Sequence, residues 1–532
     1  MVRRPSPHDP FCLGTRAAGL AVAWLGARHG GLGWIIAMVG AWSLLRVPRR
    51  RLLLELAALA LLAAALWPEG GLAVAASGAA LLIGLAAPES RALPLNALDR
   101  FFVAQDYPGT PMNSHHFVDT RAPIDRAALE RALAALMAEV PMLRSFVREA
   151  VLGVERFVAR KPWISAASLI SWSDEPLEAR DSAMLDAHID LARSPPFRVI
   201  HAPRVEGGFR LCLTVHHSAV DGEGGLLLLG WLITRYNEAR EGRPPSPLAL
   251  PPDGRRFRIL LGRKGLPWLV RAIRRHVRPF GKVGVVRAHL LDDERPQPTH
   301  SRHQMETVSP SSWEALKSAA ASLGVTRNDL LVAAALRAAD RLRSARGNPD
   351  RPYRILLPTN LRKELGMPAT LGNYVGTVKL EVTPDEVRAT SLPQVVSTKV
   401  REGRSLDESI ETPVHLGVIS AIMPPKLLRA ALRRLDADPH SFFFSFLWSH
   451  MRSPPELPLP VGADTLRILV RGSLARRPGC GLAVTQSVGA VNVVFEYLHP
   501  IVSDATARAI LQGFLAELEG LGLGKGTSET PV

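Results

Sequence analysis

The stretch that most constrains the fold is residues 209–236, because it predicts a strand, a loop and a helix in immediate succession. Apolar and β-prone residues alternate from Leu211 to Val215, a period of two that indicates a buried strand. The apolar run 226–233 then indicates a helix that ends near Tyr236. Between them lies the loop HHSAVDG, residues 216–222. Loops held between rigid elements are frequent places for functional residues.

The loop carries the residue types of a general-base site. His216 and His217 are neighbours at a strand end, so we expect one to pack inward and the other to face a cavity. Histidine suits this chemistry because its unperturbed pKa is about 6.5. Asp221 can hold the loop by pairing with an arginine or with backbone N–H groups, and Gly222 permits a tight turn or a close approach to substrate. Alternatively, both histidines are packed structural residues; the full HHxxxDG pattern in this setting favours a functional site.

This pattern resembles the signature of the chloramphenicol-acetyltransferase-like superfamily. Its members include condensation domains of peptide synthetases, carnitine and plant acyl-CoA transferases, and bacterial wax ester synthase/diacylglycerol acyltransferases. The resemblance implies that His217 faces a substrate tunnel as the base and that Asp221 is a structural brace. Arg144 and Arg362 are the candidates for its partner. Further segments resemble elements of the superfamily: VPMLR at 140–144, SPPFR at 194–198, TRNDLL at 326–331, PTNLR at 358–362, and LGNYVG at 371–376, which contains Asn373.

The resemblance covers roughly residues 91–525 and implies an α/β fold of two similar lobes with a tunnel between them. We therefore predict an N-terminal hydrophobic membrane segment at 1–90, an N-terminal acyltransferase lobe at 91–290, a C-terminal lobe at 291–525 and a disordered tail at 526–532. Within these lobes we expect a helix capped by Asp125 and a long alanine-rich helix from about residue 325. A second histidine pair, His115-His116, lacks a following DG, and we predict that it is structural.

The N-terminal segment contains four apolar runs between residues 17 and 87, each shorter than the ~20 residues that span a bilayer. We expect two helical hairpins, or two or three spans. Arginines at positions 3, 4, 46 and 49–51 would stay cytoplasmic by the positive-inside rule, which leaves the lobes on the cytoplasmic side of the inner membrane. The alternatives are a cleaved signal peptide and a buried helical subdomain.

Positive charge is concentrated in two places. Residues 1–51 contain eight arginines and one acid, and residues 255–282 contain ten lysines and arginines and no acid; together they carry +17, while the whole chain carries +16. The second stretch flanks apolar residues such as Trp268, which favours a membrane surface with anionic lipids over nucleic acid. Alternatively, it packs on the domain by its apolar side. The predicted membrane-surface residues are Arg271, Arg274, Arg275 and Arg278.

The predicted reaction is acyl transfer from a thioester to a hydroxyl of a lipid-like acceptor. The donor would be acyl-CoA or an acyl-carrier protein, used as a co-substrate, with no bound cofactor. Three cysteines lie far apart, and no metal or nucleotide motif is present in the sequence, so we expect no metal. Two alternatives stay open: a condensation-type enzyme that forms an amide, and a non-catalytic protein of the same fold that binds acyl groups or lipids.

Overall fold

The computed structural model describes residues 92–520, with gaps at 94, 108–109, 151–152, 160–163, 178–183, 249–267, 269–287, 293–299, 349, 406, 438–443, 453–456, 477 and 488–489. The predicted membrane segment, the predicted tail and the four arginines at 271–278 lie outside the described residues. Among the helices of the described part, none is both long enough and apolar enough to cross a bilayer.

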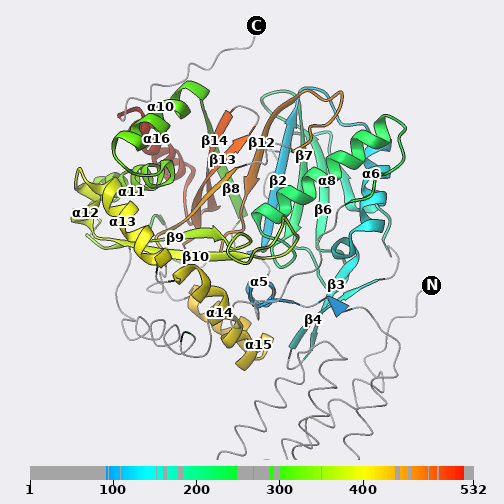
Figure 1. The fold of residues 1–532 in the computed structure, drawn as a ribbon, viewed down its shortest axis with the longest axis horizontal. Coiled ribbons are helices and arrows are strands. Elements are labelled where there is room, and N and C mark those ends of the chain that lie inside the picture. Colours follow the sequence, from blue (N-terminus) through cyan, green and yellow to red (C-terminus); the bar gives the residue numbers. More distant parts are fainter. Residues whose placement is uncertain are drawn as a thin grey trace, which may run out of the picture.

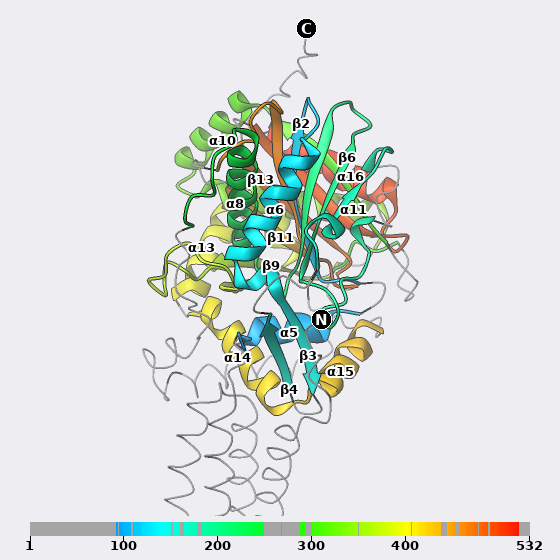
Figure 2. The ribbon, with the colours of Figure 1, turned by 90° about the vertical axis from the view of Figure 1, so that its right-hand side faces the viewer.

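The N-terminal lobe is built on a five-stranded sheet in the order β12-β2-β7-β6-β5. Its helices, α6 and α8, lie side by side against the sheet (Figure 2). Leu129, Leu133 and Leu136 on α6 meet Leu228 and Leu232 on α8 in the core. The elements are β2 (Asn113–Thr120), β5 (Ile170–Trp172), β6 (Phe197–Pro203), β7 (Phe209–His216), β12 (Thr465–Arg471), α6 (Arg126–Glu139) and α8 (Gly222–Arg240).

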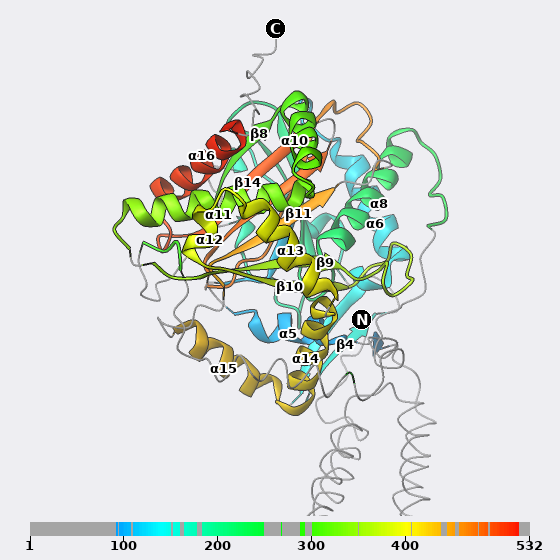
Figure 3. The same cartoon turned by 60° about the vertical axis from the view of Figure 1, so that its left-hand side comes forward.

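The C-terminal lobe is built on a six-stranded sheet in the order β10-β9-β11-β13-β14-β8. Helices α10, α11, α13 and α16 cover it (Figures 1 and 3). The strands are β8 (His300–Val308), β9 (Tyr353–Asn360), β10 (Val375–Val382), β11 (Phe446–Arg452), β13 (Cys480–Ser487) and β14 (Ala490–His499). The helices are α10 (Pro310–Ser322), α11 (Arg327–Ala345), α12 (Pro384–Arg388), α13 (Leu392–Ser405) and α16 (Asp504–Gly520).

The two sheets are joined by a strand that crosses between them. β12 follows β11 in the chain, yet it pairs antiparallel with β2 and forms the edge of the N-terminal sheet. β12 also contacts β13 of the other sheet. The two lobes are thus connected by backbone hydrogen bonding as well as by side-chain packing.

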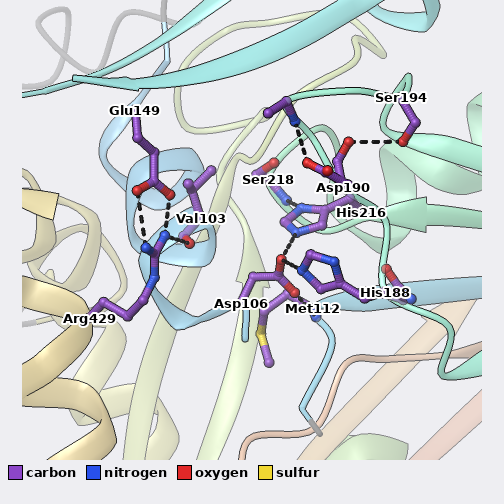
Figure 4. A network of polar contacts seen from close by, with 12 residues as sticks. Val103, Asp106, Met112, Glu149, His188, Asp190, Ser194, His216, Ser218 and Arg429 are labelled. Atoms are coloured by element: carbon purple, nitrogen blue, oxygen red, sulfur yellow. Dashed lines mark hydrogen bonds and ion pairs between the residues drawn. The ribbon is translucent and has the colours of Figure 1, made fainter. Parts of the chain in front are cut away.

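A smaller layer lies below both sheets in Figure 1. It contains a three-stranded sheet, β1-β4-β3, and helices α5, α14 and α15. Arg429 of α15 pairs with Glu149 of β3 and donates to the Val103 carbonyl of α5, which ties the three elements together (Figure 4). The bounds are β1 (Ala92–Leu93), α5 (Ala97–Gln105), β3 (Ser145–Ala150), β4 (Gly153–Val158), α14 (Glu408–Ile422) and α15 (Pro425–Ala437). Two short turns of 3-10 helix, η2 (Pro141–Arg144) and η3 (Ala167–Leu169), contact α6 and β6 of the N-terminal lobe.

Local signals set several of these boundaries. Asp125 caps α6 by accepting a hydrogen bond from the Ala128 N–H at 2.7 Å, as its sequence position predicts. Thr326 and Asp329 form a capping box at the start of α11.

Trp268, the one described residue between 249 and 287, is buried beside Leu361 and Tyr374. Trp268 itself is therefore packed on the domain.

Candidate active site

His216 ends β7 and is fully buried. Its Nδ1 accepts a hydrogen bond from the Ser218 N–H at 3.0 Å, and its Nε2 lies 3.3 Å from Asp106 Oδ2. The same carboxylate receives His188 Nε2 at 2.7 Å and the Met112 N–H at 3.0 Å (Figure 4). Burial alone would raise the pKa of Asp106, but the hydrogen bonds from the two histidines outweigh it and hold that pKa well below its usual range. His216 is therefore an inward-facing, paired residue.

His217 is only partly buried and lies in a different environment. Its backbone N–H donates to the Met112 carbonyl at 2.6 Å, and its ring stacks on Phe102 of α5 with centroids 4.0 Å apart. Nδ1 lies 3.1 Å from Asn373 Oδ1. Within the described residues, Nε2 has no hydrogen-bond partner. Removal from solvent lowers the pKa of His217, which keeps the imidazole neutral at pH 7.

Asp221 braces the loop through four kinds of contact. Its Oδ1 caps α8 by accepting from the Gly224 N–H at 2.8 Å, and its Oδ2 accepts from the Tyr374 N–H at 2.8 Å. Its carboxylate forms a bidentate pair with Arg362, with both N···O distances at 2.9 Å. Its own N–H donates to the Gly372 carbonyl. Because both partners of the ion pair are buried, the HHxxxDG loop is fixed to the C-terminal lobe.

Of the two arginines proposed as partners of Asp221, Arg362 has that role. Arg144 lies in η2, and its Nη1 donates to the Ala138 carbonyl at 2.9 Å. The sequence analysis proposed both arginines, and no feature of the sequence favoured one over the other. Their separation from Asp221 along the chain is large in each case, so the choice depends on which segments the folded lobes bring together.

Asn373 holds His217 in place. Its Nδ2 donates to the His217 carbonyl and to Asp99 Oδ1, both at 2.7 Å. Its own carbonyl accepts from Asn96 Nδ2 at 2.8 Å. Asp99, Phe102 and Asp106 all come from α5 or the residue that ends it, a segment in which the sequence analysis identified no site residue. The Asn96–Asp99 spacing of a capping box was the one available signal, and it did not point to His217.

Two glycines after the histidines permit close packing. A Cβ on Gly222 would lie 2.5 Å from Met451 Sδ on β11, so this glycine lets the two lobes approach. A Cβ on Gly225 would lie 1.9 Å from His116 Nε2. His116 therefore fills the space beside α8, as expected for a structural histidine.

Within the described part of the chain, no group of three or more His, Cys, Asp or Glu side chains is arranged to hold an ion. Cys212 and Cys480, the two cysteines among the described residues, are buried and free. The described site offers a proton acceptor at Nε2 of His217.

Comparison with known sequences gives matches over part of the chain. No family model matches the sequence. The chain is 33% identical over 159 residues to an uncharacterized protein of Mycobacterium tuberculosis and 28% identical over 149 residues to the phthiocerol/phthiodiolone dimycocerosyl transferase of the same organism. These segments are 29% and 28% of this chain, and the chain spans about a third of the length of these relatives, 36% and 35%.

Solved structures match over most of the chain. The first condensation domain of the calcium-dependent antibiotic synthetase superposes with a TM-score of 0.60 at 18% identity, over 82% of this chain and 98% of that one. The epimerization domain of the third module of tyrocidine synthetase B superposes with a TM-score of 0.57 at 14% identity, with the same coverage. These likenesses show that the chain has the condensation-domain fold, which is the fold that the resemblance of the HHxxxDG loop implies.

Proposed function

We propose that this protein is a membrane-associated acyltransferase that moves an acyl group from a thioester to a hydroxyl of a lipid-like acceptor, with His217 as general base. One observation carries the proposal: Nδ1 of His217 is held by Asn373, while Nε2 has no partner among the described residues. A neutral imidazole in this state accepts a proton at Nε2. The name of the dimycocerosyl transferase relative supports acyl transfer as the reaction class.

The proposed step balances without a covalent enzyme intermediate. Nε2 of His217 takes the hydroxyl proton as the acceptor oxygen attacks the thioester carbonyl carbon. The tetrahedral intermediate then collapses, the C–S bond breaks, and the leaving thiolate takes the proton from the imidazolium. The products are an ester and a free thiol. General base catalysis of this kind is worth about 10²–10⁴-fold in rate.

The test uses the purified full chain in detergent, incubated with acyl-CoA and a panel of long-chain alcohols and amines, with products read by mass spectrometry. We expect ester formation that depends on His217 and releases one thiol per ester. Turnover by a folded His217→Ala protein at the parent rate would contradict the base assignment.

Amide formation is the second candidate, because the fold extends over 98% of the condensation domain from the antibiotic synthetase. In that case the donor would be a carrier-protein thioester, and the panel repeated with that donor would yield product in the amine arm and none in the alcohol arm. Specific ligand binding without turnover in either arm would favour a non-catalytic acyl-binding protein.

Membrane association rests on the apolar runs of residues 1–90 and the arginines between them. We expect the full chain to resist carbonate extraction and a C-terminal reporter to report from the cytoplasm. Release by carbonate, or a C-terminus outside the cytoplasm, would contradict this part of the proposal.

A further inference from the structure

A line of buried side chains leads from β4 to the base. Arg156 Nη1 lies 3.9 Å from Asp99 Oδ2, and Asp99 Oδ1 accepts from Asn373 Nδ2 at 2.7 Å. Asn373 Oδ1 in turn lies 3.1 Å from Nδ1 of His217. Arg156, Asp99 and Asn373 each have 0% exposed area. Arg156 also donates to the Ser218 carbonyl at 2.7 Å, so both ends of the line meet the HHxxxDG loop.

The contacts of Asn373 decide which way its amide faces. Nδ2 meets an Asp99 carboxylate oxygen and the His217 carbonyl, and both of these atoms only accept hydrogen bonds. The NH₂ group must therefore point to them, which turns Oδ1 toward the imidazole. An amide oxygen also only accepts, so Nδ1 of His217 must carry the proton. The lone pair is then on Nε2.

We propose that Asp99 is a positioning residue for the base: its carboxylate fixes the Asn373 amide and thereby the tautomer that leaves Nε2 of His217 free to accept a proton. The expected effect on turnover rests on the proposed function. The tautomer itself does not, because it exists in the protein without substrate. Phe102, one turn along α5 from Asp99, stacks on the same ring. A single short helix therefore sets both the plane and the protonation of the imidazole.

The two oxygens of Asp99 are both in use. Oδ2 accepts from the Asn96 N–H at 3.0 Å in the capping box of α5, and Oδ1 accepts from Asn373. An asparagine at position 99 has one accepting oxygen. If that oxygen continues to accept from the Asn96 N–H, the new NH₂ group faces Nδ2 of Asn373. Two hydrogen-bond donors then point at each other. Rotation of the Asn373 amide relieves that clash and presents an NH₂ group to Nδ1 of His217, which selects the opposite tautomer.

The chain contains a matched control. Asp329 occupies the same capping-box position at the start of α11, where its Oδ2 accepts from the Thr326 N–H at 2.9 Å, and it is 3% exposed. No hydrogen bond to Oδ1 of Asp329 occurs within the described residues. Asp329→Asn therefore tests the removal of a buried capping carboxylate without any connection to His217.

The experiment measures the imidazole ¹⁵N shifts of His217 in the full chain labelled with ¹⁵N-histidine, assigned by the signals lost in His217→Gln. We expect a protonated Nδ1 and an unprotonated Nε2 in the parent and in Asp329→Asn. Asp99→Asn should show a protonated Nε2. Its kcat should fall by about 10²–10⁴-fold with little change in KM, since a wrong tautomer removes the base but not the binding surface.

Asn373→Ala provides the second variant and keeps the test valid if Asp99→Asn does not fold. It removes the oxygen that faces Nδ1, so the His217 signals should again depart from those of the parent. A protonated Nε2 in the parent, or unchanged His217 shifts in a folded Asp99→Asn protein, would overturn the proposal. Because the shifts are read without substrate, this result is separate from the outcome of the acyl-transfer assay.

Discussion

The chain contains two histidine pairs on neighbouring strands of one sheet, and they do different things. His115-His116 lies inside β2, and His216-His217 lies at the end of β7. β2 and β7 pair antiparallel, with Thr214 opposite His115 and Leu213 opposite His116. The two dipeptides thus have the same composition and nearly the same place in the fold. What differs is the set of groups that surrounds each pair.

The hydrogen bonds of the first pair lie within its own lobe. His115 Nδ1 lies 3.0 Å from Thr214 Oγ1, and the ring of His116 fills the space over Gly225. Burial lowers the pKa of His116 to about 3, so its imidazole stays neutral in the folded protein. Neither ring contacts the loop at 371–374 through a hydrogen bond given by the structure.

The second pair lies at the end of β7, where it contacts the C-terminal lobe. His217 meets Asn373 from the C-terminal lobe, and Asp221 pairs with Arg362 from the same lobe. The comparison shows that a histidine dipeptide is not itself the signal of a site. The strand end, the aspartate four residues later and the partners from another lobe are what distinguish the second pair.

The largest difference between the pairs should be in turnover. His217→Ala removes the proposed proton acceptor, so acyl transfer should fall by about 10²–10⁴-fold in a protein that stays folded. His116→Ala should leave the rate per folded molecule unchanged, because its ring packs against α8 and not in the site. Initial rates of thiol release, normalised to folded protein, give the measurement. Equal losses in the two variants would remove the distinction between the pairs.

The next effect is on stability and concerns the brace of the second pair. Asp221→Asn leaves the buried Arg362 guanidinium without its bidentate partner, and breaking such a pair on one side costs about 3–5 kcal/mol. We expect a large decrease in the urea midpoint. Asp385→Asn is the control, because Asp385 is exposed and 4.0 Å from Arg388, and its loss should not move the midpoint. A midpoint equal to the parent's in Asp221→Asn would show that the loop does not depend on this pair.

A smaller loss is expected at the first pair. Gly225→Ala places a methyl group 1.9 Å from the fully buried His116 ring, and overpacking of this kind costs about 1–3 kcal/mol. The double variant with His116→Ala should regain part of that loss, since the two changes share one space. Gly520→Ala in α16, where a Cβ would meet no atom within 4 Å, should not destabilise the protein. Additive losses in the double variant would contradict the packing role of His116.

Local patterns in the sequence predicted the elements that carry the second pair. The alternation of residues 211–215 corresponds to β7, and the following apolar run corresponds to α8, which begins earlier than expected, directly after Asp221. The cap of α6 by Asp125 was predicted from a side chain that acts on its own backbone, and the start of α11 near Thr326 from the alanine-rich run that follows it. Signals of this kind are readable because both partners lie within a few residues.

The contacts that complete the site join residues that are far apart in the sequence. Asp99 and Asn373 are 274 residues apart, and Asp221 and Arg362 are 141 apart. Arg362 and Asn373 were found through the resemblance, whereas Asp99, Asp106 and Arg156 were missed because no local pattern marks them. The crossing of β12 to the edge of the N-terminal sheet was likewise absent from the sequence analysis, because strand order depends on tertiary packing.

The smallest expected effect concerns His188, a partly exposed residue that shares the Asp106 carboxylate with His216. His188 is 40% exposed and donates to Asp106, the carboxylate that also pairs with His216 (Figure 4). The hydrogen bond to Asp106 raises the pKa of His188, so the native state holds that proton more tightly than the unfolded chain. The resulting stabilisation is complete below about pH 6.5 and is lost as the pH rises through the raised value. His188→Gln should therefore lower the free energy of unfolding at about pH 5, by less than ~1 kcal/mol because solvent screens the pair, and should match the parent at about pH 9. Urea unfolding of both proteins across this range measures the difference, and a difference that grows with pH would contradict the pairing.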